Sequence, residues 1–186
     1  ESREELRELV TEADMVFLTV GMGGGTGTGG APIIAELAKE AEALTIGIVT
    51  KPFSFEGLRR QKVAEEGINR LLEKVDTLII ITNDRLLAVA SRDLLLNDAF
   101  SMVDDVLRRA VQAITDIITV PGIINVDFAD VKAVMKDGGP AWLSIGGGTG
   151  RDRAKDAARD ALNSPLLDVS IEGAKGVLFN VTGSIS

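Results

Sequence analysis

The amino-acid sequence predicts an α/β protein, in which a parallel, Rossmann-like sheet is followed by a long central helix and then by an α+β region. Three observations lead to this prediction. In the first half of the chain, short apolar runs of strand length alternate with helix-length segments. The runs are apolar throughout, which is typical of parallel strands covered on both faces. A single long helical segment then follows, and a second alternation of helices and strands begins after Pro121-Gly122.

The first half of the chain opens with a helix, which is predicted by an apolar stripe of Leu6, Leu9, Val10 and Ala13. Pro32 suits the first turn of a later helix, because the first turn leaves its N–H groups unbonded. In chain order we then expect a strand at 15–20, a glycine-rich loop at 21–30, a helix at 32–43, a strand at 44–50, a loop at 51–57, a helix ending near residue 74 and a strand at 77–82.

The second half is organised around a long helix. Helix 98–119 carries apolar residues on most of its sides, so we expect it to be buried between two masses. The predicted elements after it are a helix at 129–136, a strand at 141–145, a helix at 151–163 and a strand at 176–181. The glycines within 141–150 are expected to form a tight connection and not a second ligand site. The predicted domains are therefore residues 1–97, the connecting helix 98–119 and residues 120–186.

Charge and composition exclude several classes of function. The net charge is −8 and there is no long basic block, which argues against duplex nucleic acid as a partner. The chain contains neither cysteine nor histidine, which excludes disulfides, the usual zinc sites and a histidine general base. No apolar run approaches the roughly 18 residues of a membrane span, and the first residues do not resemble a signal peptide. We therefore expect a cytoplasmic protein without direct membrane insertion.

The segment from Gly21 to Gly30 is the strongest candidate for a ligand site. It lies between a predicted buried strand and a predicted helix, and most of its residues are glycine. Glycine allows tight turns and close approach of the backbone to a ligand, while the following helix offers free N–H groups and a positive dipole end. Thr26 and Thr28 add hydroxyl donors. The alternative is a turn that binds nothing, but the usual βα connection of about two to six residues needs fewer glycines.

The spacing of residues in this segment narrows the choice of phosphate ligand. A Walker loop requires Gly-Lys followed by Ser or Thr, and Gly-Lys occurs nowhere in the chain. Gly25, Gly27 and Gly30 match the spacing of the dinucleotide fingerprint. However, Thr50-Lys51 stands where the ribose-binding acid of that fingerprint is expected. NAD is therefore disfavoured.

Several motifs resemble one family. Residues 23–29, Gly-Gly-Gly-Thr-Gly-Thr-Gly, are similar to the signature loop of the tubulin superfamily, which holds nucleotide phosphates without a Walker lysine. Residues 50–57, Thr-Lys-Pro-Phe-Ser-Phe-Glu-Gly, and 125–131, Asn-Val-Asp-Phe-Ala-Asp-Val, resemble FtsZ more than tubulin. Residues 83–87 and 164–167 agree as well. Over essentially its whole length the chain resembles FtsZ, the bacterial-type cell-division GTPase of that superfamily.

This resemblance implies how much of the family's architecture the chain contains. Residues 1–97 would be the second half of the GTP-binding domain, and 120–186 the catalytic loop and the start of the C-terminal activation domain. An earlier segment with further phosphate loops and the far C-terminal part are expected to be missing. The isolated chain is therefore expected to bind GTP weakly or not at all, and to be inactive.

The resemblance also implies which residues bind GTP or GDP. Glu56 would accept from ribose hydroxyls and Arg60 would donate to anionic oxygens. Asn83 would face the nucleotide, Phe100 would pack on guanine, and Asp104 would accept from its N–H groups. The full GTP-binding set is Gly23, Gly24, Gly25, Thr26, Gly27, Thr28, Gly29, Glu56, Arg60, Asn83, Phe100 and Asp104. No protein-built metal site is expected, and Mg²⁺ would accompany the nucleotide.

Each of these residues has a plainer interpretation when the resemblance is set aside. Glu56 and Arg60 lie four residues apart and would form a solvated ion pair. Asn83 is a common turn residue. Phe100 would be a core residue beside a solvated acid, and helical periodicity does not distinguish Asp104 from the adjacent Asp105.

The last predicted site is a loop containing Asn125, Asp127 and Asp130. The two acids are three residues apart at a helix start, so both carboxylates can orient or polarise a water molecule. From spacing alone, capping of the helix is the favoured interpretation. The resemblance implies that these three residues are catalytic, and that the loop enters the nucleotide pocket of the next subunit.

The resemblance therefore predicts a GTPase that polymerises head to tail into protofilaments of the cell-division ring at mid-cell. Other division proteins, such as anchors and inhibitors, would bind the full-length protein. Two alternatives remain open. One is a related filament GTPase that segregates DNA or shapes cells, which the FtsZ-like catalytic loop disfavours. The other is a structural module that does not hydrolyse GTP.

Overall fold

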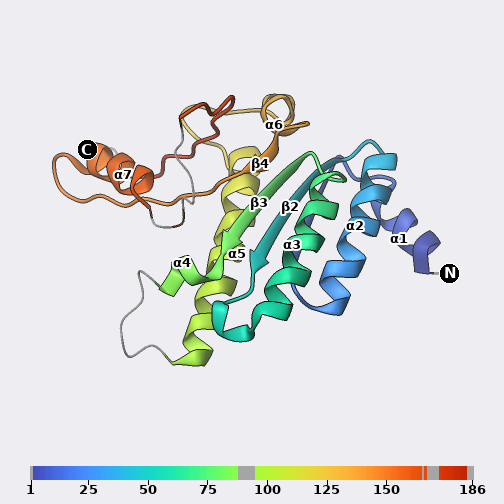
Figure 1. Ribbon diagram of the computed structural model, residues 1–186. Coiled ribbons are helices and arrows are strands. Elements are labelled where there is room, and N and C mark those ends of the chain that lie inside the picture. The colour runs from blue at the N-terminus through green and yellow to red at the C-terminus, as the bar shows by residue number, and fades with distance from the viewer. Residues whose placement is uncertain (1, 88–94, 165, 167–171, 184–186) are drawn as a thin grey trace.

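The computed structural model describes residues 2–87, 95–164, 166 and 172–183, and a four-stranded parallel sheet lies at its centre (Figure 1). The strands lie side by side in chain order. In the register, Met15 pairs with Leu44, Ile46 with Thr77, and Thr77 with Gly139. The strands are β1 (Met15–Gly21), β2 (Leu44–Lys51), β3 (Thr77–Thr82) and β4 (Gly139–Ala141).

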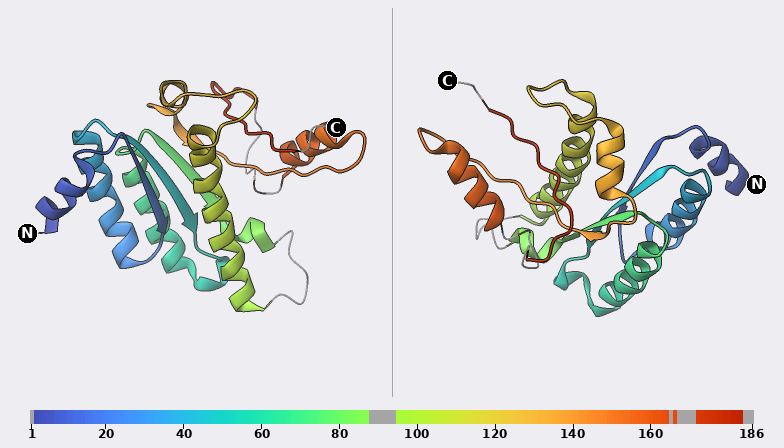
Figure 2. Two further views of the ribbon diagram at one scale, coloured as in Figure 1. Left: turned by 180° about the vertical axis from the view of Figure 1, so that it is seen from behind. Right: turned by 90° about the horizontal axis from the view of Figure 1, so that it is seen from above.

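Helices cover both faces of this sheet (Figure 2). α2 and α3 pack on one face, α5 and α6 pack on the other, and α1 lies against α2. The α/β fold predicted from the sequence is thereby confirmed. The helices are α1 (Ser2–Val10), α2 (Gly25–Glu40), the 3₁₀ turn η1 (Ser54–Glu56), α3 (Leu58–Leu72), α4 (Asn83–Leu87), α5 (Leu96–Thr119), α6 (Phe128–Met135) and α7 (Arg153–Leu162).

The burial of β2 explains why its sequence is largely apolar. Every residue of the strand except the last is buried. Leu44, Ile46 and Ile48 belong to the core under α5, whereas Val49 belongs to the core under α2 and α3. Because successive side chains of a strand point to opposite faces, a strand covered on both sides has few positions for polar residues, and the polar residues buried here are the threonines Thr45 and Thr50.

α5 begins two residues earlier than predicted and differs from the prediction in its burial. Ala99, Val103, Ala110 and Ile114 are buried against the sheet. The opposite side of the helix carries polar residues that form their own exposed ion pairs, such as Asp105 with Arg108. The expectation that α5 is buried between two masses is therefore wrong, because this polar side keeps one face of the helix in contact with solvent.

The start of α2 also differs from the prediction. The helix begins at Gly25, so much of the segment expected to be a loop is helical and Pro32 lies inside the helix. Glycine lowers helix propensity by about 1 kcal/mol per residue relative to alanine. Tertiary packing offsets this cost, because Thr28 and Ala31 in the first turns are both buried.

The C-terminal region contains less strand than predicted. β4 covers Gly139–Ala141 and not 141–145, and residues 176–181 form no strand in the described part of the chain. A strand forms only where a neighbour offers a hydrogen-bonding ladder, so the β propensity of Val177, Phe179 and Val181 is not sufficient. These three side chains are largely exposed. The predicted motif at 164–167 lies partly outside the described residues.

The glycines within 141–150 do form a tight connection, as expected. A Cβ placed on Gly146 would lie 2.1 Å from the carbonyl oxygen of Ala157, and one on Gly148 would lie 1.9 Å from that of Arg153. Gly147 N also donates to Asp160 Oδ2 at 3.0 Å. These glycines allow the chain to pass directly over the backbone of α7.

A group of hydrogen bonds fastens α6 and β4 to the amino edge of the sheet, where β2 and β3 begin. Asp76 is buried, its Oδ2 accepts from Thr45 N at 2.8 Å, and its carbonyl accepts from Gly139 N at 2.8 Å. The hydroxyl of Thr77 donates to the carbonyl of Met135. α5 runs from the opposite, carboxyl edge to this one, so it connects the two ends of the sheet (Figure 1).

None of the helices in the described part of the chain is both long enough and apolar enough to cross a membrane.

Candidate functional site

Three segments that follow strands lie at the carboxyl edge of the sheet. They are the loop after β1 at 22–24, the loop after β2 at 52–57 and the start of α4 at Asn83, directly after β3. In open sheets of parallel strands, ligands bind outside the carboxyl ends of the strands. The Met22 N–H donates to the Thr50 carbonyl at 3.0 Å, and the Ser54 N–H donates to Asp84 Oδ1 at 2.9 Å. The first bond joins the loop after β1 to the end of β2, and the second joins the loop after β2 to α4.

Glycine is required at two positions, one in the loop after β1 and one in the first turn of α2. Gly23 has φ +101°, and a Cβ on it would lie 2.8 Å from the carbonyl oxygen of Arg60. A Cβ on Gly27 would lie 2.6 Å from Val20 Cγ1 and 2.9 Å from the Gly21 carbonyl oxygen. The backbone therefore passes closer to its neighbours here than any side chain would permit.

The amino end of α2 is open to a ligand. Its N-cap residue, Gly24, makes no side-chain capping hydrogen bond, and the first turn carries no acidic residue. No atom lies within 4 Å of a Cβ placed on Gly24, Gly25 or Gly29. The first-turn N–H groups of a helix lack intrahelical partners, and the helix dipole places partial positive charge there. This end of α2 is suited to bind an anion such as a phosphate.

The two threonines of the loop differ in their surroundings. Thr26 is exposed, whereas Thr28 is only 2% exposed and its Oγ1 accepts from Gly23 N at 3.0 Å. The hydroxyl of Thr28 is therefore directed at the loop itself, while that of Thr26 remains available to a ligand.

Glu56 and Arg60 form the ion pair that their spacing predicts, between Glu56 Oε2 and Arg60 Nη1. Glu56 Oε1 also accepts from Phe53 N at 2.8 Å, which closes the turn after β2. The Glu56 side chain is 12% exposed and the Arg60 side chain 55% exposed. Of the two, Arg60 is the better placed to reach a ligand in solvent.

Asn83 has the clearest unsatisfied polar group at this edge. The residue is 4% exposed, and its Oδ1 has no hydrogen-bond partner among the described residues. An unsatisfied buried acceptor costs about 1–3 kcal/mol, so natural proteins rarely retain one without a function. A ligand that donates a hydrogen bond would remove this cost.

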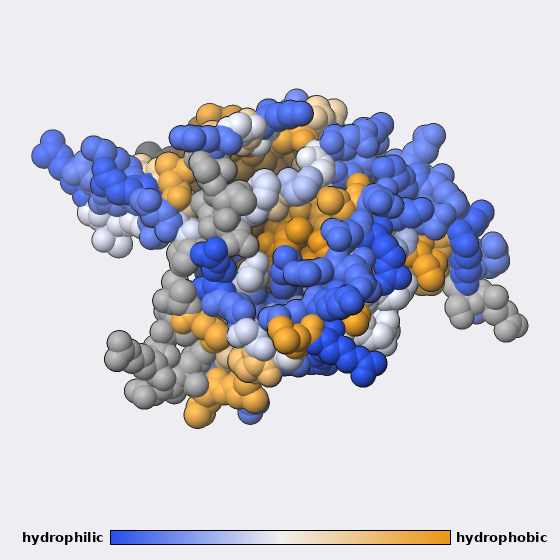
Figure 3. Space-filling view, in the orientation of Figure 1, coloured by the Kyte–Doolittle hydropathy of each residue, from blue (hydrophilic) through white to orange (hydrophobic). Residues whose placement is uncertain are grey.

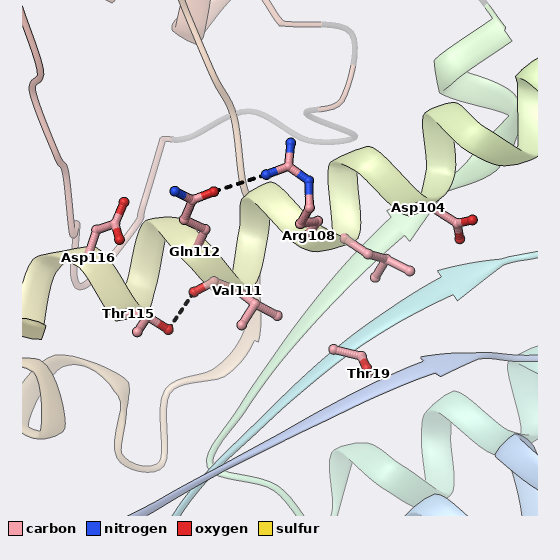
Figure 4. Close-up of a pocket in the computed structure, with 8 residues that line it drawn as sticks. Thr19, Asp104, Arg108, Val111, Gln112, Thr115 and Asp116 are labelled. Carbon is pink, nitrogen blue, oxygen red and sulfur yellow. Dashed lines mark hydrogen bonds between the residues drawn. The ribbon is translucent and has the colours of Figure 1, made fainter.

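Phe100 and Asp104 lie on the part of α5 that faces this edge. The ring of Phe100 meets Phe53 edge-on at 5.4 Å and Phe55 at 6.5 Å, and it remains 40% exposed. Asp104 lines a cavity of about 500 Å³ between α5 and Thr19 of β1 (Figure 4). The cavity has a carboxylate in its wall, and Phe100 lies one helical turn before Asp104 on α5, which are features that a planar base with N–H donors would fit.

The structure also distinguishes Asp104 from Asp105. Asp105 accepts from Arg108 Nη2 and Arg109 Nε, each at 2.6 Å. These hydrogen bonds hold the pKa of Asp105 below its ordinary value. The carboxylate of Asp104 has no hydrogen bond or ion pair with any described residue, so it is the acid available to a ligand.

The predicted catalytic residues lie at the opposite, amino edge of the sheet. Asp127 is the N-cap of α6, and its Oδ1 accepts from Asp130 N at 2.9 Å. Asp130 Oδ2 accepts from Asp127 N at 3.4 Å, and Asn125 Oδ1 accepts from Gly122 N at 2.6 Å. The capping interpretation is thus confirmed as a structural role. It does not exclude catalysis, because all three residues are exposed.

The two sets of residues are too far apart to act on one ligand within a single chain. From Asp104 to Thr119, α5 rises about 22 Å at 1.5 Å per residue. The loop of Asn125, Asp127 and Asp130 begins beyond that point, next to α6 (Figure 1). The structure therefore brings the predicted GTP-binding residues together and separates them from the predicted catalytic residues.

Sequence reasoning missed two residues that support the carboxyl edge. Asp84 fixes the loop after β2 through Ser54 N, as described above, and Gly67 of α3 contacts Thr28 of α2. A Cβ on Gly67 would lie 2.2 Å from Thr28 Cγ2. An isolated glycine within a helical pattern indicates close packing. Gly67 lies inside α3, so the sequence could have indicated a close contact there.

Comparison with known proteins agrees with this arrangement. A model of the GTPase domain of the Tubulin/FtsZ family matches residues 1–91, and a model of the C-terminal domain of the FtsZ family matches residues 139–186. An FtsZ dimer from M. jannaschii, solved empty, is 50% identical over 93% of this chain, with a TM-score of 0.89. The chain belongs to the FtsZ family.

Further solved structures support this family and its fold. A tryptophan-to-tyrosine mutant of the M. jannaschii FtsZ is 50% identical over 94% of this chain, with a TM-score of 0.90. This chain spans about half the length of both FtsZ structures, 50% and 52% of them. A CetZ from Methanosaeta thermophila covers 87% of this chain and 46% of its own at 20% identity, with a TM-score of 0.69, and it shares the fold.

The organisms of these structures correct one detail. The sequence motifs were identified with a bacterial-type FtsZ, whereas both FtsZ structures at 50% identity are archaeal. The chain is therefore described as an archaeal-type member of the FtsZ family.

Proposed function

We propose that this FtsZ-family chain supplies part of a GTP site, at the carboxyl edge of its sheet, in a longer cell-division GTPase, and that by itself it binds GTP weakly or not at all. The observation that carries the proposal is the convergence of three unsatisfied features at that edge. They are the uncapped amino end of α2, the partnerless Oδ1 of Asn83 and the free carboxylate of Asp104 in the wall of a cavity. A guanine nucleotide offers phosphates to the first and N–H donors to the others.

The roles proposed for the individual residues follow from their positions. The N–H groups of the glycine loop and α2 hold phosphate oxygens, with Thr26 adding a hydroxyl. Arg60 donates to the anionic part of the nucleotide, and Glu56 holds Arg60 and the turn after β2 in place. Phe100 stacks on guanine, and Asp104 accepts hydrogen bonds from the N–H groups of the base. Asn83 accepts a hydrogen bond from the nucleotide through its Oδ1.

Mg²⁺ is proposed to arrive with the nucleotide. Among the described residues there is no cluster of acids that would hold a metal ion by itself. Mg²⁺ commonly binds through substrate phosphates and retains several waters, so it needs no dedicated protein cage. The ion would offset phosphate charge during hydrolysis.

Hydrolysis is proposed to require a second copy of the protein. Asn125, Asp127 and Asp130 lie at the edge of the sheet opposite the GTP site, and this separation supports head-to-tail assembly. In that assembly, the carboxylates of one subunit would position a water molecule against the nucleotide of the next. Assembly would produce the protofilaments of a division ring at mid-cell, with anchors and inhibitors as further partners. The division of the chain at 97/98 and 119/120 belongs to this proposal.

Two other functions compete with this one. A filament GTPase that segregates DNA or shapes cells would share the same site, but the 50% identity to FtsZ structures favours cell division. A structural module that does not hydrolyse GTP would keep the capping role of Asp127 and Asp130 and lose only the catalytic one.

Sedimentation tests the proposal directly. The protein, in the longest form that its gene encodes, is centrifuged with Mg²⁺ and either GTP or GDP, while phosphate release is followed in parallel. We expect polymer in the pellet with GTP only, and phosphate release that rises more steeply than protein concentration. Equal pellets with both nucleotides, or phosphate release strictly proportional to protein concentration, would contradict hydrolysis at a subunit contact.

A further inference from the structure

Thr28 is unusual among the predicted GTP-binding residues because it is buried on two sides. Its Oγ1 accepts from Gly23 N at 3.0 Å, and the residue is 2% exposed. Its methyl group faces α3 at the position of Gly67, where a Cβ would lie 2.2 Å from Thr28 Cγ2 and 3.4 Å from Met22 Sδ. The side chain is therefore held by α3 on one side and by the glycine loop on the other.

Gly23 is the residue that this arrangement fixes. Its backbone has φ +101°, and it is wedged between the Arg60 carbonyl and Pro52, since a Cβ there would lie 2.8 Å from the first and 3.4 Å from the second. With its N–H bonded to Thr28, Gly23 has no donor left for a ligand. The loop then leads into Gly24 and Gly25, which lie in open space at the amino end of α2.

We infer that Thr28 is a positioning residue, whose hydroxyl shapes the phosphate loop without touching phosphate, and that Gly67 provides the space that makes this possible. The inference rests on the proposed function, because it concerns the affinity of the glycine loop for a nucleotide. α3 thereby acts on the loop after β1 through this methyl-to-glycine contact, in addition to the Arg60 carbonyl that lies beside Gly23. Gly67 is a second positioning residue, more remote from the ligand than Thr28.

The surroundings of the Thr28 hydroxyl favour a positioning role over direct contact with phosphate. The hydroxyl of Thr26 is exposed and so can donate to a phosphate, and the buried Oδ1 of Asn83 has no partner among the described residues. The Thr28 oxygen is covered and already bonded within the protein. A direct ligand would also be indifferent to a methyl group added on α3, whereas a positioning residue held by α3 would respond to it.

The contact offers a compensating pair of substitutions. Gly67→Ala places a methyl where Thr28 Cγ2 lies, so Thr28 must move and release Gly23 N. Thr28→Ser removes that Cγ2 and keeps the hydroxyl, so the double variant Gly67→Ala with Thr28→Ser recovers the space. Thr28→Val keeps the shape and loses the acceptor. Gly30→Ala is the matched control, because it adds the same methyl to a glycine of α2 with no atom within 4 Å.

The experiment has two readouts on the protein in the longest form that its gene encodes. Amide hydrogen exchange of Gly23 is measured by NMR without ligand, and dissociation constants for GTP and GDP are measured by calorimetry. We expect Thr28→Val and Gly67→Ala to speed the exchange of Gly23 and to weaken both nucleotides about tenfold, the scale of one lost buried hydrogen bond. The double variant should recover most of both losses, and Gly30→Ala should resemble the wild type.

The outcomes distinguish the inference about Thr28 and Gly67 from the proposed GTP binding. A double variant no better than Gly67→Ala alone, or a Gly67→Ala protein with normal Gly23 exchange and normal affinity, overturns the inference. Weakening of GTP alone by Thr28→Val would indicate direct contact with the terminal phosphate and would also overturn it. If the wild-type protein binds neither nucleotide, the proposed function fails, while the exchange of Gly23 still decides whether Thr28 and Gly67 hold the loop. Melting temperatures show whether a variant is folded.

Discussion

The two edges of the sheet differ in whether their polar groups have hydrogen-bond partners within the protein. At the amino edge, Asp127 and Asp130 bond to each other's backbone N–H groups, and Asn125 bonds to Gly122. At the carboxyl edge, α2 starts without a side-chain cap and the Oδ1 of Asn83 is buried without a partner among the described residues. The polar groups named at the amino edge are satisfied by the protein itself, whereas those named at the carboxyl edge lack such partners among the described residues.

This difference indicates what each edge requires in order to act. Buried polar groups without partners cost free energy that a ligand can return, so the carboxyl edge should gain stability when it is occupied. The amino edge has nothing to gain from a small ligand, and its exposed carboxylates become useful only where another surface meets them. The comparison therefore predicts that substitutions at one edge change binding, while substitutions at the other change turnover.

The largest expected effect separates turnover from binding at the amino edge. Asp130→Ala should lower GTP turnover by about 100-fold or more, the scale of a lost general acid or base, while GTP affinity of the monomer stays near wild type. Filaments should still form and should last longer, because hydrolysis no longer weakens the contact. Turnover, affinity and melting temperature are measured on one sample.

The capping role predicts a different result for the same variant. Asp130→Ala keeps the N-cap Asp127 and loses only the 3.4 Å hydrogen bond from Asp127 N, so a purely structural role predicts a stability loss smaller than the about 1 kcal/mol of a full N-cap, with turnover per folded molecule intact. Asp152→Ala is the matched control, since Asp152 is an N-cap whose side chain makes no capping hydrogen bond. Mixing Asp130→Ala with a protein defective only in its own GTP pocket should restore part of the activity. A folded Asp130→Ala protein with wild-type turnover would remove this residue from catalysis.

The next effect tests the glycine loop. Gly27→Val should weaken GTP about tenfold or more, because its Cβ would lie 2.9 Å from the Gly21 carbonyl oxygen and push the loop out of shape. Gly30→Val introduces the same β-branched residue into α2 without a close neighbour and serves as the control. Calorimetric titration of both variants checks this. If Gly27→Val bound GTP like the wild type, phosphate would not lie on this loop.

A smaller effect concerns the choice of base. Asp104→Ala should reduce the preference for GTP over ATP by about 1–3 kcal/mol, because guanine offers N–H donors where adenine presents an acceptor. Asp105→Ala should leave the preference intact, since Asp105 is bonded to Arg108 and Arg109. Competition assays with both nucleotides distinguish the two acids. An unchanged preference in Asp104→Ala would transfer this role to Asn83 or the backbone.

The smallest effect concerns pH and α5. Hydrogen bonds from Arg108 and Arg109 lower the pKa of Asp105 in the folded protein. The stability that Asp105 contributes is therefore present above its unfolded pKa of about 3.9 and is lost as pH falls through the lower folded value. Thermal unfolding of Asp105→Asn and wild type should differ slightly at pH 6 and converge toward pH 2. The side chain is exposed, so added salt should shrink the difference.

The sequence predicted the first three strands of the sheet well because the relevant signals are local, whereas β4 lies at Gly139–Ala141 and not at 141–145. Continuous apolar runs place β1, β2 and β3 within one residue of their observed ends, and β3 agrees at both ends. The long helix and the helix at the catalytic loop were also found, within two residues at each end. The positions of these elements follow from periodicity and capping signals, which can be read from the local sequence without knowledge of tertiary contacts.

The remaining features depend on contacts that the sequence does not display. α2 begins within the glycines because Thr28 and Ala31 pack on neighbouring elements, and residues 176–181 form no strand because no ladder is offered to them. For the site, the motifs gave the candidate residues, but only the structure showed that Asp104 and not Asp105 lines the cavity, and that Thr28 is covered. These outcomes depend on where elements meet in space.

The position of the two edges at opposite ends of α5 also fixes how many working sites an assembly can contain. Each hydrolytic centre would combine the nucleotide of one subunit with the acids of the next. Such a contact joins unlike surfaces, and it produces an open filament where the rotation between subunits does not close a ring. A linear filament would then contain one fewer complete centre than it has subunits, so that a dimer would have a single centre and the terminal subunit would keep its nucleotide unhydrolysed. The specific activity per subunit would therefore rise with filament length toward a plateau, and fragmenting filaments at constant protein concentration would lower it.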